Sequence, residues 1–415
     1  MERISTNMMN DDMQYQLRNR EAMLNDMQNK IASQRRILSP RDDPAAAANS
    51  TRYQSYLARL SRYANNIQYA MDKHQTAEGY MRETVDIMQR IRELAVQGAN
   101  GTYTKSDLQS MGQEVNQLLG ELVKVGNSRS PDGTTIFAGL LTRNEPFREV
   151  MGNVPGAEGQ VITNVQYVGD IGHNKTDISD VATANVNFPG NRVFWAEQQQ
   201  IIPSVNATGY VVQHDSTIYL DNVPVDLKAG DNVYAIMQKI NDSAAAVKAS
   251  LDPVSNAMVL QSTTPHQIWL EDGPNSSTLK DLGVANATNG NPPRNVATDA
   301  RVYGGSLFDM VIRLRDAMYS GNTLDVGGSA LRGIDDGLHN LLGNLGRLGA
   351  ESERLDLTLK RTEAEIPDVT GQNSHLVDLD MTKAITDLRM LEYTHQAALQ
   401  TAARILPPTL LDFMR

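Results

Sequence analysis

The chain has 415 residues, of which 40% are hydrophobic and only 5% are aromatic, while methionine occurs 18 times. This composition predicts a folded protein of two or three domains, and it favours thin helical layers because few rings are available to fill a thick core. The formal net charge of −11 disfavours binding to nucleic acid or to anionic membranes, since no excess of cations can displace counterions.

Cysteine is absent, which excludes disulfides, thiolate nucleophiles and Cys-ligated zinc. Residues 1–5 (Met-Glu-Arg-Ile-Ser) lack the apolar core of a secretory signal. No run approaches the ~18 apolar residues of a membrane span. We therefore expect a soluble chain, or one that is exported by a route without such a signal.

Residues 1–126 are predicted to be helical. In the first helix a narrow apolar stripe repeats every seven residues, at Leu17, Leu24, Ile31 and Leu38. A second helix carries a fuller heptad pattern that His74 and Glu78 interrupt. The third is predicted to begin at Thr104–Asp107, which has the form of a capping box, and it continues with an unbroken apolar seam.

Between the first two helices, residues 38–51 read LSPRDDPAAAANST. Pro40 disfavours helix at Ser39, so the first helix is expected to end there. Asp43 before Pro44 predicts a helix start, because a carboxylate can cap the first amides and proline needs no N–H at the first helical position. We predict a hinge formed by Pro40, Asp42, Asp43 and Pro44. On this pattern alone an ordinary helix–helix connector is the simpler interpretation.

Residues 151–300 lose the helical period, and Gly, Asn, Pro, Thr and Val become frequent. Strand-like alternation appears at residues 160–168 and 217–227, with a turn expected at Asp221-Asn222. Residues 232–248 read as one helix. We predict that this part is an inserted, β-rich domain.

The C-terminal part mirrors the N-terminal part. A leucine seam over residues 301–366 is broken at Ile366-Pro367-Asp368, and a last amphipathic helix follows with Ile385, Leu388, Leu391, Leu399 and Leu406. The predicted fold class is α+β: both chain ends form a long antiparallel helical bundle or coiled coil, to which a β-hairpin and the β-rich domain are added. If the two ends pair, the two breaks lie at similar heights. The predicted segments are 1–42, 43–150, 151–300, 301–366 and 367–415.

Three stretches resemble the flagellin family of the bacterial flagellum. Residues 39–45 (SPRDDPA) are similar to the family's segment before the second helix, and residues 132–139 (DGTTIFAG) to the β-hairpin after its third helix. Residues 378–399 resemble its C-terminal helix with the leading acidic pair. The resemblance covers about residues 1–150 and 301–415, and residues 210–270 are similar to a βαββ repeat inserted in many flagellins and hook-associated proteins.

Within that family, two features are similar to hook-associated proteins at the hook–filament junction. One is Phe137-Ala-Gly139 followed by Pro146 and Phe147; the other is the ending Thr-Leu-Leu-Asp-Phe-Met at residues 409–414. The resemblance implies a structural flagellar protein, not an enzyme, that is exported without a cleaved signal and assembles as a ring accepting flagellin. Its implied partners are further copies, the other junction protein on the hook side, flagellin and a type III export chaperone. The filament subunit itself is the alternative.

The terminal stripes define a predicted assembly interface. An isolated helix with two apolar residues in seven buries too little surface to offset its ordering entropy, so these helices are expected to be covered by identical neighbours. The interface residues are Leu17, Leu24, Ile31, Leu38, Ile385, Leu388, Leu391, Leu399, Leu406, Leu410, Leu411, Phe413 and Met414. For the last four residues, docking on the chain's own first helix and protection by a chaperone stay open.

No pattern predicts a catalytic, metal or cofactor site. The seven histidines lack ligand spacing. His214-Asp215-Ser216 contains the residue types of a triad, but sequence neighbours are not thereby oriented as one, and a hairpin start is the better interpretation. Asn-X-Ser/Thr sites at Asn174, Asn206, Asn275 and Asn286 leave glycosylation open.

Overall fold

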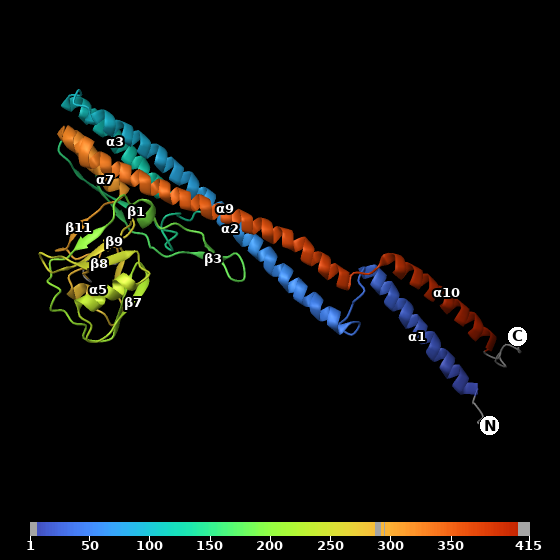
Figure 1. The fold of residues 1–415 in the computed structure, drawn as a ribbon. Helices are drawn as coiled ribbons and strands as arrows, with labels where there is room; N and C mark the ends of the chain where they lie inside the picture. The colour runs from blue at the N-terminus through green and yellow to red at the C-terminus, as the bar shows by residue number, and fades with distance from the viewer. Residues whose placement is uncertain (1–5, 287–291, 294, 406–415) are drawn as a thin grey trace. The chain divides into compact units, whose positions relative to one another are not determined.

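The computed structural model describes residues 6–286, 292–293 and 295–405 (Figure 1). The chain forms two compact units: the first comprises residues 1–65 and 360–415, and the second residues 66–359. Helices α2 (Pro44–Ala99) and α9 (Leu331–Val377) contribute residues to both units. The predicted α+β class, the long helices of the two chain ends and the β-rich middle region are confirmed. The finer division into five segments stays a prediction.

In the first unit, α1 (Thr6–Ser33) and α10 (Met381–Ile405) lie side by side (Figure 1). The prediction that the first helix ends at Ser39 was wrong. The helix stops at Ser33 because Gln34 adopts a left-handed conformation with φ 57°. Leu38 therefore lies outside the helix whose heptad it was expected to extend.

The predicted helix break at Pro367 was also wrong, since α9 continues through this proline to Val377. A proline inside a helix removes one backbone hydrogen bond and crowds the preceding turn. Here, buried side chains on both sides of the proline hold the helix in place, namely Thr362, Val369 and Val377. Packing thus overrides the local preference of the residue.

The two breaks in the first unit lie at the same level. The amide of Arg36 donates to the carbonyl of Val377 at 2.7 Å, and the amide of Leu379 donates to the carbonyl of Gln34 at 3.0 Å. The C-terminal break is therefore at Asp378–Asp380 instead of Pro367. The prediction that the breaks have similar heights is confirmed with this corrected position.

The helical part of the second unit contains α3 (Lys105–Gly126), which packs against α7 (Leu307–Ser320), together with α8 (Thr323–Asp325) and the π-helical turn η1 (Val326–Ala330). The predicted capping box is confirmed, because Thr104 N donates to Asp107 Oδ2 at 2.9 Å and Asp107 N to Thr104 Oγ1 at 3.3 Å. His74, expected as a gap in the seam of α2, is fully buried and contacts the Asn185 carbonyl at 2.8 Å.

Two hairpins and a short helix follow α3: β1 (Phe147–Asn153) with β2 (Gln160–Tyr167), β3 (Lys175–Asp177) with β4 (Thr183–Asn185), and α4 (Gly190–Val193). The hairpin predicted at residues 132–139 is reduced to one isolated bridge, between Arg129 and Thr135. The ladder of paired residues forms further along the chain, between β1 and β2.

The remainder of the β-rich region has its own apolar core. One sheet has the order β11-β5-β9-β8 and another the order β10-β6-β7. The elements are β5 (Gln200–Ile202), β6 (Ser216–Leu220), β7 (Val223–Leu227), α5 (Val233–Asp242), β8 (Val247–Leu251), β9 (Met258–Ser262), β10 (Leu270–Asp272), α6 (Thr278–Asp281) and β11 (Arg301–Tyr303). The turn at Asp221-Asn222 is confirmed by positive φ values of 51° and 62°.

The helix predicted over residues 232–248 begins as expected, because the Asn232 side chain accepts from Ala235 N at 3.0 Å. It ends early, at Asp242. Val247 already belongs to β8, where it pairs with Ser262. Alternating burial of Val247 and Ala249 explains why the strand replaces the last helical turns.

Four of the six phenylalanines form one cluster where the hairpins meet the helices of the second unit. The rings of Phe137 and Phe194 lie 5.0 Å apart, and the ring of Phe147 lies 4.9 Å from that of Phe308 and 5.1 Å from that of Phe194. Edge-to-face pairs of this kind add to the stabilisation from area burial. Phe137 and Phe147, predicted as hairpin residues, are therefore core residues.

Gly139 allows the chain to pass close to a neighbouring loop. It has φ +67°, and a Cβ atom there would lie 2.1 Å from the carbonyl oxygen of Asp170. Gly133 has a similar φ of +80°, but a Cβ atom at that position would meet open space. The two glycines therefore separate the cost of backbone strain from the cost of a steric clash.

We predict that Gly139→Ala lowers the free energy of unfolding by ~3 kcal/mol or more, because strain and a backbone clash add together. The matched variant Gly133→Ala should cost ~1 kcal/mol, from strain alone. Chemical denaturation followed by circular dichroism measures both. Equal losses in the two variants would contradict the close approach at Asp170.

Candidate assembly interface

One row of α1 side chains is half-buried, and none of its members is fully buried. The row follows the 3-4 spacing of a helix face, with Met13, Leu17, Arg20, Leu24, Met27 and Ile31. The facing row on α10 contains several small residues: Met381, Ala384, Leu388, Leu391, His395, Ala398 and Ala402. The two helices therefore cover each other along one face only.

The two helices run antiparallel. The Arg20 guanidinium donates to the Thr394 carbonyl at 2.8 Å, whereas the bridge between Arg35 and Asp378 lies at the other end of the pair. Arg20 is the one charged member of the row on α1. Its stem lies in the half-buried row, and its charged group reaches a backbone carbonyl of the partner helix. No local pattern signals this contact, because Thr394 is 374 residues away.

Five of the predicted interface residues lie on the facing rows: Leu17, Leu24, Ile31, Leu388 and Leu391. Ile385 and Leu399 lie off the facing row and are 44% and 47% exposed, so their place in an assembly interface stays a prediction. Each lies one position after an alanine that makes the contact in its place, at 384 and at 398. Leu406, Leu410, Leu411, Phe413 and Met414 lie outside the described residues.

Leu38 is 42% exposed, and Ile37 is buried in its stead. The reason is the early end of α1, since the heptad count does not carry over into a non-helical segment.

The α1–α10 pair leaves further apolar surface open to water. Met390 is 68% exposed and Tyr393 is 74% exposed, and Tyr15 and Met23 on α1 are exposed as well. A groove of about 460 Å³ runs between the two helices, past Leu17 and Arg20 on one side and Tyr393 and Ala397 on the other. Apolar side chains along a groove are typical of an interface that needs another chain to complete it.

The segment between α1 and α2 is an ordered linker. The Asp42 carboxylate accepts from the amides of Leu38 and Ser39 at 2.8 and 2.9 Å. Asp43 caps α2, because its side chain accepts from Ala46 N at 3.0 Å. The predicted helix start at Pro44 is thereby confirmed. Whether these residues act as a hinge stays a prediction.

Arg36, which sequence reasoning passed over, also holds the linker. Its guanidinium donates to the Leu376 carbonyl at 2.8 Å and lies 3.5 Å from the Asp43 carboxylate.

The Ser39 and Leu38 amides hold the pKa of Asp42 below its usual value of 3.8. A carboxyl group whose pKa is depressed by folding stabilises the linker above pH 3.8, and this stabilisation is lost as the pH falls through the lowered folded pKa. We predict that Asp42→Ala accelerates hydrogen exchange of the Leu38 and Ser39 amides several-fold at pH 7. The difference in protection factors should vanish at acid pH.

The control is Asp12→Ala, which removes an exposed carboxylate from α1. It should leave both protection factors unchanged. Protection that is the same in Asp42→Ala and the parent chain at pH 7 would show that the carboxylate does not hold the linker.

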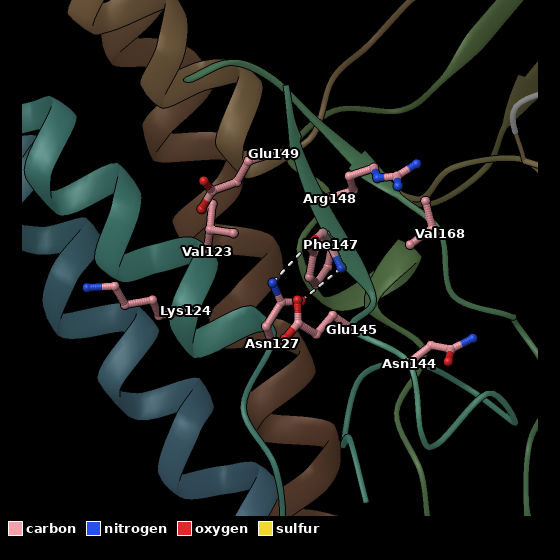
Figure 2. A pocket seen from close by; sticks show the side chains of 9 residues that line it. All are labelled: Val123, Lys124, Asn127, Asn144, Glu145, Phe147, Arg148, Glu149 and Val168. Carbon is pink, nitrogen blue, oxygen red and sulfur yellow. Dashed lines mark hydrogen bonds between the residues drawn. The ribbon is translucent and has the colours of Figure 1, made fainter. Parts of the chain in front are cut away.

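A cavity of about 800 Å³ lies beside the first residues of β1 in the second unit (Figure 2). The Asn127 side chain donates to the Phe147 carbonyl and accepts from the Phe147 amide, each at 2.8 Å, so that it mimics a neighbouring strand (Figure 2). Lys124 points away from Phe147 (Figure 2) and pairs with Glu121 at 2.8 Å. This lining brings no nucleophile and base together.

The triad residue types at 214–216 serve the fold. The Asp215 carboxylate accepts from Ala229 N at 2.9 Å and from Lys228 Nζ at 3.0 Å, and Ser216 begins β6, as the hairpin interpretation expected. Within residues 6–286, 292–293 and 295–405, no three His, Asp or Glu side chains gather as a metal site would require. None of the helices described in this range is both long and apolar enough to cross a membrane.

Comparison with known proteins identifies the family. Residues 4–142 match the family model of the bacterial flagellin N-terminal helical region, and residues 211–264 match that of the flagellin hook IN motif. These two matches place residues 4–142 and 211–264 in the flagellin family. The chain is 24% identical to Polar flagellin C of Vibrio parahaemolyticus over 99% of both chains.

Solved structures also align with the chain, two of which follow. Flagellar hook associated protein-3 of Legionella pneumophila aligns at 17% identity and TM-score 0.47, covering 78% of this chain and 98% of the other. FlgL of Xanthomonas campestris aligns at 17% identity and TM-score 0.42, covering 75% and 99%. The flagellin family consists of structural proteins of the bacterial flagellum.

Proposed function

We propose that this chain is a junction protein of the FlgL type, which assembles as a ring between the hook and the filament and accepts flagellin. The observation that carries the proposal is the incomplete cover of α1 and α10. The facing row on α1 has no fully buried member, and apolar side chains on α10 such as Tyr393 and Met390 remain exposed. Further copies of the chain provide the missing cover.

Burial of apolar surface area would drive this assembly. Burying apolar surface contributes about 25 cal/mol per Å², so covering one half-exposed Leu or Met side chain is worth ~1 kcal/mol. Ile385, Leu399, Met390 and Tyr393 together would supply a few kcal/mol per copy when neighbours close on α10. This gain is available only in the assembled state, and it stabilises the helix pair by mass action.

The partners follow from the resemblance. The stretch Phe137-Ala-Gly139 and the ending at residues 409–414 are the features shared with hook-associated junction proteins. On this basis the chain contacts the other junction protein on the hook side and flagellin on the filament side. A type III export chaperone protects the apolar ending before assembly. The protein acts in the flagellum, whether external or periplasmic.

The second candidate is the filament subunit. It is favoured by the alignment with Polar flagellin C, which spans nearly the whole chain. A filament subunit forms long polymers by itself, whereas a junction protein does not polymerise in bulk.

We expect a strain that lacks the gene to make hooks without filaments and to shed flagellin into the medium, as seen by electron microscopy and by protein analysis of the supernatant. A deletion strain with normal filaments would contradict both candidates. Long polymers formed by the purified chain, with no flagellin in the deletion strain's medium, would favour the filament subunit.

In the same strain, Leu399→Glu should fail to restore filaments although the monomer folds normally. Leu399 is exposed in the monomer, so a charge there costs little, whereas an unpaired carboxylate buried in the assembly costs several kcal/mol. Circular dichroism checks the fold, and motility checks assembly. The control Gln113→Glu adds the same charge to an exposed position of α3 and should swim normally. Full motility of Leu399→Glu would refute burial of this face.

A further inference from the structure

A small cavity in the second unit has an apolar floor and a charged rim. Its volume is about 150 Å³, and it lies between α4, α9 and the loop before β3. The floor consists of Met81, Phe188, Val193 and Leu348, and the rim includes His173, Arg192, Asn344, Arg347 and Glu351. All of these residues belong to the second unit, whereas the assembly interface on α1 and α10 belongs to the first.

Arg192 is the unusual member of the rim. It is half-buried, and among the described residues its guanidinium has neither a hydrogen-bond nor an ion-pair partner. Its backbone, by contrast, is fixed: its carbonyl accepts from Asn340 Nδ2 on α9 at 3.0 Å. A guanidinium carries five N–H donors, and arginines that lose solvent are normally paired with an anion.

The other polar groups of the rim do not supply that anion. Asn187 is neutral and is engaged with its own loop, because it accepts from Asn174 N at 2.8 Å and donates to the Gly172 carbonyl at 2.9 Å. The Glu351 carboxylate lies 3.4 Å from Arg354. Arg347 donates to Asn344 Oδ1 at 2.9 Å. The cavity is therefore lined by the guanidinium groups of Arg192 and Arg347 but by only one carboxylate, that of Glu351, which also lies close to Arg354.

His173 senses the same positive charge. Burial lowers the pKa of its imidazole, and the charges of Arg192 and Lys175 lower it further, while the Glu351 carboxylate and the Asn187 backbone oppose these effects in part. An anion in the cavity would oppose the influence of both cations.

We propose that this cavity binds one small oxyanion, of the size of a phosphate or a carboxylate, with Arg192 as the principal donor and Arg347 and His173 completing the site. The volume accommodates such an ion with a few waters, at about 30 Å³ each, and excludes a nucleotide. The bound ion would connect the loop at His173 to α4 and α9. It would thereby tie the β-hairpin segment to the helices of the second unit, independently of any assembly.

The test is thermal unfolding of the full chain with inorganic phosphate or acetate, each compared with NaCl at the same ionic strength. Phosphate, acetate or both should raise the melting temperature with saturation, and the stronger of the two identifies the preferred anion. Arg192→Gln should weaken the apparent affinity at least tenfold. The control Arg313→Gln removes an exposed arginine from α7, outside the cavity, and should behave like the parent chain.

A second readout follows the imidazole directly. In an NMR titration, the His173 signal is assigned by its absence from the spectrum of His173→Asn. Saturating anion should raise the pKa of His173 in the parent chain and in Arg313→Gln. It should not do so in Arg192→Gln. Equal thermal shifts in all three chains, or a His173 titration that the anion leaves unchanged, would overturn the site. Both readouts use the monomer, so a failure here leaves the proposed junction function untouched.

Discussion

The contact between α1 and α10 is the interaction on which the first unit depends, because each helix is the apolar cover of the other. The row on α1 is half-buried, and alanines on α10 allow a close approach while larger side chains such as Tyr393 remain exposed. Main-chain hydrogen bonds between residues 34–36 and 377–379 fix the register at one end. The register of the two helices is thus fixed within one chain, but the helices bury little apolar surface. That combination suits a segment whose stability is completed by copies of itself.

The second unit, in contrast, has a well-buried apolar core. Its helices and hairpins enclose a continuous core in which Phe137, Phe147, Phe194 and Phe308 touch one another. In a chain with so few rings, placing most of the phenylalanines at one point gives the connection between helices and hairpins a disproportionate share of the buried area. Gly139 shows how tight this connection is, since a single Cβ atom would collide with the Asp170 backbone.

Local sequence patterns predicted the helices, the capping box at Thr104 and the turn at Asp221-Asn222, because these features depend on neighbours along the chain. It failed where distant contacts decide. Pro367 stays inside a helix because residues on both sides of it are buried. His74 sits in the core because the Asn185 carbonyl offers it an acceptor. Ile385 and Leu399 follow the heptad, but the partner helix selects the alanines beside them. No local pattern contains that choice.

The first unit is assembled from the two extremities of the chain, since Arg20 bonds to Thr394 and Arg36 to Val377. Contacts of such large sequence separation cannot form until α10 has been synthesised. A polypeptide that is terminated before α10 can still form the core of the second unit, but it lacks the helix against which α1 packs. Completion of this unit therefore reports that α10 has been synthesised and has folded against α1.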